Sequence, residues 1–133
     1  MKKLLVIVVL GLLLSGNAFA NELVGKKLYC KINDNYSVSF EFGKYKVSYI
    51  PVGNDSSLVR GFKVFKSEYS YTLDMVYIQD SPYYFNIDRK TLKLTNFSNG
   101  KQCELVKRNV NLKKKMKKMF DKRYEKATSE NKI

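Results

Sequence analysis

Histidine is absent from all 133 residues of the sequence. Without it there can be no Ser-His-Asp or Cys-His nucleophile arrangement, and most zinc and copper sites lose their usual ligand. Acid–base chemistry near neutral pH would fall to carboxylates, lysine or tyrosine. Asp74, Asp80 and Glu68 could in principle pair as in glycoside cleavage, but we interpret them as solvated strand and turn residues. We therefore expect a non-catalytic protein without a metal or organic cofactor.

Arginine is also scarce, because only four of the 25 basic residues are arginine and the others are lysine. Bidentate contacts to phosphates and direct reading of bases favour arginine over lysine. We therefore do not expect a nucleic-acid partner, although the formal net charge is +13. A lysine-rich composition of this kind is also compatible with an AT-rich genome, which is the alternative to a functional reason.

The sequence is also poor in long apolar runs. The only one, Leu4 to Leu14, is shorter than the roughly twenty helical residues that span a bilayer. It follows two lysines and precedes Ala18-Phe19-Ala20, a small-x-small cleavage signal. We interpret residues 1–20 as a signal peptide, with an uncleaved membrane anchor as the alternative. The expected location is the periplasm or the extracellular space.

Only two cysteines are present, Cys30 and Cys103. In an exported protein a lone pair favours a disulfide over a metal site or a nucleophile. This bridge would close a loop of about 74 residues, for which the chain-entropy model gives roughly 4 kcal/mol. It would join the first strand of the domain to the last.

Apolar residues alternate with polar ones from Leu28 to Leu105, a period that predicts half-buried strands. The predicted inward positions include both cysteines. The pattern predicts a strand over residues 58–66, a single strand over 69–77 and three strands joined by two turns over 83–105. Gly43-Lys44 predicts a two-residue turn with positive φ at the glycine, and Asn99-Gly100 predicts a type I′ turn. We expect residues 21–106 to form a mainly β domain, a small antiparallel meander barrel or sandwich of about eight strands.

Beyond residue 106 the apolar period changes to 3.6, which predicts an amphipathic helix and a frayed tail over residues 107–133. Its apolar stripe comprises Leu112, Met116, Met119, Phe120, Tyr124 and Ala127. Its candidate contacts to an anionic surface are Lys113, Lys114, Lys115, Lys117, Lys118, Lys122 and Arg123. The stripe could instead pack on the barrel while the lysines are solvated, and the two interpretations are compatible.

Tyrosine is abundant, with ten residues in the sequence. Tyr29 and Tyr84 fall on strand faces that we predict to point outward, where tyrosine offers rigid amphipathic contact area. The alternative is that the tyrosines serve cross-strand packing.

Two motifs carry a resemblance to known proteins. Leu28-Tyr29-Cys30 and Ile87-Asp88-Arg89-Lys90-Thr91-Leu92-Lys93-Leu94, followed by Gln102-Cys103-Glu104-Leu105, resemble a set of short exported β proteins of unknown function from marine bacteria. The resemblance covers roughly residues 28–106, implies a common small β fold and offers no catalytic residues to transfer to this chain. The chain is more loosely similar to periplasmic C-type lysozyme inhibitors, although it lacks their Ser-Gly-x-x-Tyr loop and only Ser67 to Tyr71 is comparable.

These observations predict an exported binding or envelope-associated β domain, with its basic helix packed on the barrel or held at an anionic surface. The expected partner is an anionic membrane surface, an envelope polymer or a protein. The alternative function is inhibition of a wall-degrading enzyme such as lysozyme.

Overall fold

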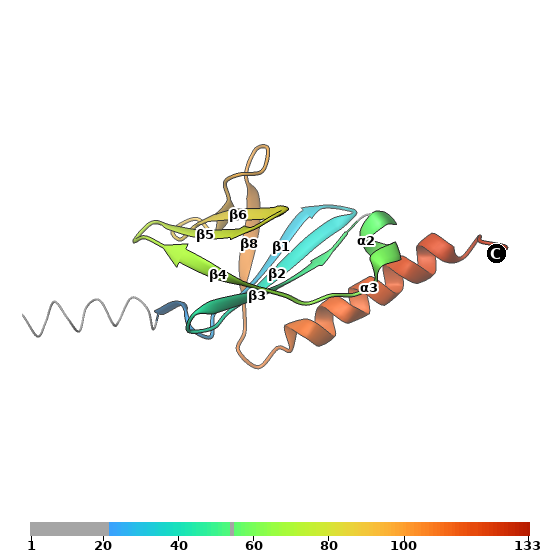
Figure 1. Cartoon of the computed structure of the whole chain (residues 1–133), viewed down its shortest axis with the longest axis horizontal. Helices are drawn as coiled ribbons and strands as arrows, with labels where there is room; N and C mark the ends of the chain where they lie inside the picture. Colours follow the sequence, from blue (N-terminus) through green and yellow to red (C-terminus); the bar gives the residue numbers. More distant parts are fainter. Residues whose placement is uncertain (1–21, 54) are drawn as a thin grey trace, which may run out of the picture.

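A computed structural model describes residues 22–53 and 55–133, so the expected signal peptide lies outside the described residues. Eight antiparallel strands form a closed barrel in sequence order (Figure 1). The predicted mainly β domain of about eight strands is confirmed, and the structure selects the barrel over the sandwich. The strands are β1 (Lys27–Asn33), β2 (Tyr36–Phe42), β3 (Lys46–Val52), β4 (Phe65–Tyr71), β5 (Met75–Asp80), β6 (Tyr83–Asp88), β7 (Lys93–Leu94) and β8 (Lys101–Val106). Helix α2 (Asp55–Arg60) lies between β3 and β4, and α3 (Leu112–Thr128) follows the last strand.

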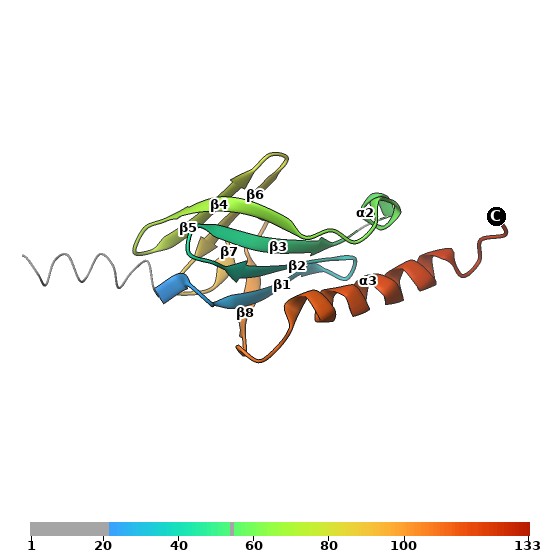
Figure 2. The ribbon, with the colours of Figure 1, turned by 60° about the horizontal axis from the view of Figure 1, so that its bottom comes forward.

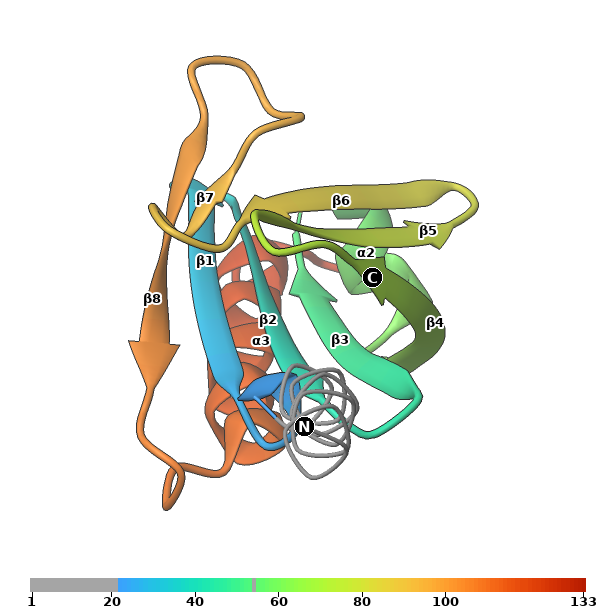
Figure 3. The same ribbon diagram turned by 90° about the vertical axis from the view of Figure 1, so that its left-hand side faces the viewer.

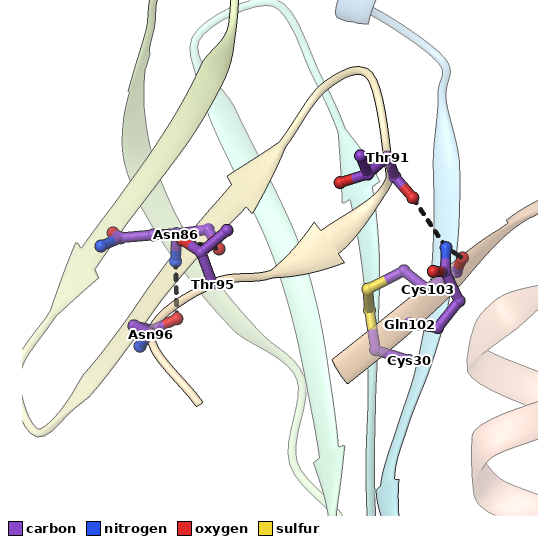
Figure 4. The surroundings of a disulfide bond; sticks show 7 residues. All are labelled: Cys30, Asn86, Thr91, Thr95, Asn96, Gln102 and Cys103. Atoms are coloured by element: carbon purple, nitrogen blue, oxygen red, sulfur yellow. Dashed lines mark hydrogen bonds between the residues drawn. A yellow bond between two sulfur atoms is a disulfide. The ribbon is translucent and has the colours of Figure 1, made fainter. Parts of the chain in front are cut away.

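The barrel closes where the first strand pairs with the last. β1 and β8 run antiparallel with Lys27 opposite Val106, and Cys30 lies directly opposite Cys103. The two cysteines form the predicted disulfide, with their Cα atoms 4.1 Å apart and both side chains buried inside the barrel (Figure 4). The covalent bond and the hydrogen-bonded ladder therefore fix the same register.

Side chains complete the barrel wall beside the two-residue strand β7. The amide of Asn96 accepts a hydrogen bond from the main-chain N–H of Asn86 (3.0 Å) and donates one to the main-chain oxygen of Tyr84 (2.7 Å). Across the other edge, Gln102 Nε2 donates to the main-chain oxygen of Thr91 (2.8 Å; Figure 4). These amides extend the ladder where the backbone of β7 is too short to satisfy its neighbours.

The interior of the barrel is filled by side chains, as expected for eight strands. Its centre is aromatic: the Phe40 and Phe85 rings meet edge to face at 5.0 Å, and Tyr49 packs beside Phe85 at 5.5 Å. A second cluster lies outside the barrel, where Ile50 and Val52 of β3 are buried with Met116 and Phe120 of α3. The helix therefore covers the outer face of β2 and β3 and runs along the length of the molecule (Figures 2 and 3).

This covering corrects the predicted pattern of β2. The alternation places Ser37 and Ser39 on the outward, solvated face, but both side chains are buried. They lie opposite Val52 and Ile50 of β3, within the surface that α3 covers. Period two identifies the two faces of a strand correctly but does not show that a distant helix packs on the outer one.

The predicted strand over residues 58–66 is wrong. Residues 55–60 form α2, and β4 begins only at Phe65. The helix ends at Gly61, whose φ of +87° is the left-handed conformation that often follows a helix. The six-residue helix is too short to reveal itself by a 3.6-residue period.

The predicted single strand over residues 69–77 is also wrong, because the chain turns between β4 and β5. Thr72 organises the turn: its Oγ1 accepts hydrogen bonds from the N–H groups of Asp74 (3.3 Å) and Met75 (3.0 Å). The turn shifts the alternation by one, since Tyr71 pairs with Val76. Val76 and Ile78 are therefore the buried positions of β5, in place of the predicted odd-numbered set.

The two predicted tight turns have different outcomes. Asn99 and Gly100 have φ values of 65° and 60°, so the positive φ that a type I′ turn requires is present at both residues. Gly43 is not among the residues with positive φ, and the connection from β2 to β3 spans residues 43–45. A Cβ at Gly43 would lie 2.9 Å from the Lys46 main-chain oxygen, so close backbone approach explains the glycine.

Reduction of the disulfide is expected to lower the free energy of unfolding, by up to about 4 kcal/mol in the chain-entropy model. Urea unfolding of the native protein with and without reductant measures the loss. The double variant Cys30→Ala/Cys103→Ala is the control, and its unfolding midpoint should not respond to reductant. An equal midpoint for oxidised and reduced native protein would contradict this expectation.

Candidate functional site

Helix α3 presents the candidate basic surface, and its ends and buried side are well defined. Asn111 caps its N-terminus, where the side-chain oxygen accepts a hydrogen bond from the N–H of Lys114 (3.1 Å). Leu112, Met116 and Phe120 are buried, in agreement with the predicted stripe, whereas Tyr124 and Ala127 are exposed. The apolar stripe therefore packs on the barrel along the first nine residues of α3, from Leu112 to Phe120.

Arg123 is not a free contact for an anionic surface. Its guanidinium donates hydrogen bonds to three main-chain carbonyls, those of Val52 (2.7 Å), Asn35 (2.7 Å) and Asp34 (3.3 Å). These carbonyls lie at the end of β3 and in the turn from β1 to β2. Arg123 consequently fastens the second half of α3 to the barrel, and this use corrects its predicted role.

The lysines of α3 divide into two groups. Lys115 is half-buried with its ammonium 4.4 Å from the centre of the Tyr29 ring, and Lys117 pairs with Asp121 at 2.9 Å. The other predicted lysines are exposed to solvent. They are Lys113, Lys114, Lys118 and Lys122. We call these four residues the α3 lysine face.

The near end of α3 is held by a lysine of the barrel. Lys27 Nζ donates to the main-chain oxygens of Val110 (2.7 Å) and Arg108 (3.0 Å), and it lies 3.7 Å from Glu41. With Arg123 in its second half, the helix is attached to the barrel at two points. The α3 lysine face therefore has a fixed position on the molecule.

Of the two predicted exposed tyrosines, one is exposed. Tyr84 on β6 has 53% of its surface accessible. Tyr29 is half-buried beneath α3, where its hydroxyl donates to Ser37 Oγ (3.1 Å) and Lys115 lies over its ring. Tyr29 therefore serves the helix–barrel contact and is not available as a free aromatic contact.

The candidate carboxylates are not brought together. Asp74 and Asp80 flank the two ends of β5, and Asp74 pairs with Lys90 at 3.1 Å. Asp80 Oδ2 accepts a hydrogen bond from the buried Tyr49 hydroxyl (2.5 Å). Burial, followed by this hydrogen bond, raises the pKa of Tyr49. Ser67 to Tyr71, the segment compared with the lysozyme inhibitors, lies within β4.

Tyr36 lies near the same end of the barrel as Tyr49. Burial raises the pKa of Tyr36 to about 12, and the nearby Tyr83 adds to the shift. Asp88 is shifted in the other direction at the turn after β6. The N–H groups of Thr91 and Lys90 donate to its carboxylate and lower its pKa. Asp88 therefore supports the turn, as the sequence predicts.

A cavity at one end of the barrel was missed by the sequence analysis. It has a volume of about 440 Å³ and lies where β1 and β6 meet the chain before β1 and after β8. Its lining combines apolar side chains of the barrel wall with four charged residues. The lining residues are Glu22, Leu23, Lys26, Leu28, Phe42, Val76, Ile87, Arg89, Leu92, Leu105 and Arg108. We call this cavity the mouth pocket.

Leu105 gave the one signal that could have revealed the mouth pocket. The alternation places it inward with Cys103, yet 56% of its surface is accessible. An inward residue of a closed barrel stays exposed only where the filling of the barrel stops. The charged residues carried no such signal, because Arg89 belongs to a segment whose pattern indicates only a turn.

Comparison with protein-family models, with curated proteins and with solved structures finds no match for this chain. Within the described residues, no group of three or more acidic or cysteine side chains is arranged to hold a metal ion. In the same part of the chain, no helix has the length and apolar character that a membrane span requires.

Replacing Arg123 by methionine is expected to lower the free energy of unfolding by about 1.5–3 kcal/mol, because the carbonyls of Val52 and Asn35 lose a charged donor. Arg123→Lys should recover only part of the loss, since one ammonium cannot reproduce the planar fork. Urea unfolding measures both. Lys122→Met is the matched control and should leave the midpoint nearly unchanged; a similar loss in the control would contradict the role given to Arg123.

Stability is expected to fall at alkaline pH through the buried tyrosines. In the unfolded chain Tyr36 ionises near its ordinary pKa of 10.0, whereas in the folded protein it stays protonated to about 12. The folded state therefore loses up to about 1.4 kcal/mol per pH unit between these values, and none below pH 9. Urea midpoints across this range should fall less steeply for Tyr36→Phe. Tyr45→Phe, at a position that is 73% exposed, should follow the native slope.

Proposed function

We propose that this chain is an exported, non-catalytic binding domain that is held at anionic surfaces by the α3 lysine face. The observation that carries the proposal is the orientation of α3. Its apolar side is buried on the outer surface of β2 and β3, while Lys113, Lys114, Lys118 and Lys122 are exposed on the rest of the helix. Because the helix is already held on the barrel, its backbone needs no further ordering when the lysines meet a partner.

Export is supported by two features of the chain. The first is the signal-peptide pattern of residues 1–20. The second is the disulfide between Cys30 and Cys103, a bond that persists in oxidising compartments outside the cytoplasm. The absence of histidine from the sequence supports a non-catalytic role.

The electrostatic attraction is large enough to matter. A lysine close to an anionic membrane contributes up to about 1 kcal/mol, an effect that falls off over a Debye length of roughly 8 Å at physiological ionic strength. Residues 107–133 carry eleven basic and three acidic side chains, so no comparable number of acidic groups offsets the attraction. Four exposed lysines on one helix therefore contribute up to about 4 kcal/mol, which corresponds to weak, reversible association.

The folded structure decides how this proposal should be tested. Removing residues 107–133 would uncover Ile50 and Val52 and would delete Met116 and Phe120 from the same cluster. A truncated chain that failed to bind would thus report on folding as much as on charge. Charge substitutions on the α3 lysine face keep the buried side of the helix intact.

We expect the native protein to co-sediment with vesicles that contain phosphatidylglycerol, and not with vesicles of phosphatidylcholine alone. Changing all four residues of the α3 lysine face to glutamine should weaken this association by at least about tenfold. Added salt should weaken the native association in the same direction.

The matched control removes the same charge elsewhere on the surface. It changes four exposed lysines outside α3 to glutamine: Lys44, Lys63, Lys66 and Lys93. This control should bind nearly as well as the native protein. An equal loss of vesicle association in the two variants would show that only the net charge matters. If the native protein did not sediment with the vesicles at low salt, the proposal would be refuted.

A further inference from the structure

The mouth pocket is an apolar hollow at one end of the barrel. Leu28, Phe42, Val76 and Ile87 form its buried part, and each exposes less than a tenth of its surface. Leu105 stands at its opening with more than half of its surface accessible. The volume of about 440 Å³ lies within the range of roughly 300–1,000 Å³ that small-molecule sites occupy. The barrel thus leaves apolar surface in contact with water at this end.

The segment before β1 partly covers the hollow. Leu23 is buried in the barrel core cluster, and the chain then turns at Gly25, whose φ is +83°. The Gly25 N–H donates to the main-chain oxygen of Phe42 (2.8 Å), and the Phe42 N–H donates to that of Lys26 (3.0 Å). The cover is therefore hydrogen-bonded to the end of β2 and places Lys26 at the opening.

The rim of the mouth pocket is predominantly basic, with Lys26, Arg89 and Arg108 against the single acidic residue Glu22. Arg89 is already engaged: it donates to Glu22 (3.1 Å) and to the main-chain oxygen of Thr72 (2.7 Å), and its side chain is 15% exposed. No ion pair within residues 22–53 and 55–133 involves Lys26 or Arg108, and both are exposed. Two cations at the opening thus remain available to an anionic group.

An apolar hollow with available cations at its opening is complementary to one kind of small molecule. An acyl chain gains free energy by displacing water from the leucine, valine and phenylalanine surface. Its headgroup stays at the rim, where a carboxylate or phosphate accepts charge-assisted hydrogen bonds from lysine and arginine. A cationic amphiphile would meet the same apolar surface but would be repelled at the rim.

We propose that the mouth pocket binds a single-chain amphiphilic anion, with its acyl chain against Leu28, Val76 and Leu105 and its headgroup at Lys26 and Arg108. This names a ligand class for the binding domain proposed above. It depends on residues of the barrel end and on none of the α3 lysine face. The two proposals can therefore fail separately.

Isothermal titration of the purified protein with laurate, below its micellar concentration, tests the site. The expected result is saturable binding at one site per chain. Dodecyltrimethylammonium has the same tail and the opposite charge, and should bind at least about tenfold more weakly. Dodecyl phosphate should bind as laurate does, since the rim recognises the charge. No saturable binding of laurate, or equal binding of the cation, would overturn the proposal.

Two pairs of variants locate the ligand. Lys26→Gln/Arg108→Gln should weaken laurate binding by about tenfold or more, whereas Lys44→Gln/Lys63→Gln removes the same charge elsewhere and should not. Leu105→Gln should weaken binding through the tail, whereas Leu73→Gln, at a position that is 65% exposed and outside the pocket, should not. Equal binding by both members of either pair would place the ligand elsewhere and refute the assignment.

The variant in which the α3 lysine face is changed to glutamine separates this proposal from the proposed surface role. It should bind laurate as the native protein does, although its association with vesicles is weakened. Loss of laurate binding in this variant would overturn the assignment to the mouth pocket. Unfolding midpoints near the native value confirm that each variant is folded.

Discussion

The pairing of β1 with β8 is the constraint on which the rest of the structure depends. Every other strand pairs with its neighbour in sequence, but this pair joins residues more than seventy positions apart, and it alone turns a meander into a closed barrel. Non-local contacts of this kind form late, because the chain must first lose the entropy of the intervening loop. The Cys30–Cys103 bond lowers this entropy cost, because it restricts the conformations that the unfolded chain can adopt. A fragment that ends before β8 lacks one of the two strands that close the barrel.

The position of α3 depends in turn on the closed barrel. The outer surface of β2 and β3 is not the polar surface that an isolated barrel would show, since Ile50 and Val52 point outward and are buried in a cluster that includes Met116 and Phe120. The helix is thus part of the fold, and its lysines face outward because its other side is occupied. Arg123 and Lys27 use their charges to hold main-chain carbonyls at the two ends of the helix. Basic residues in this chain therefore have two distinct uses, and only those without such partners are available to a ligand.

Local patterns predicted much of this fold, and their failures have physical reasons. The alternation in β1 and β8 identified the inward cysteines, and the 3.6-residue period identified the buried side of α3. The sequence did not predict the turn between β4 and β5, because Thr72 stabilises it and the turn contains no glycine, proline or asparagine. The sequence did not predict the burial of Tyr29 and Ser37, because it depends on the packing of α3, which lies far along the chain after the last strand. Lys26, Arg89 and Arg108 surround one opening only through the closure of the barrel, and no spacing in the sequence brings them together.

The lengthwise position of α3 also fixes an orientation. The helix starts beside Lys27, at the end of the barrel that holds the mouth pocket, and it reaches the opposite end at Val52 (Figure 2). A flat partner that rests on the outward side of α3 therefore lies parallel to the long axis of the molecule. In that arrangement the barrel would lie on its side. No residue of α3 lines the mouth pocket, so a partner on the helix and a ligand in the pocket would contact different residues of the molecule.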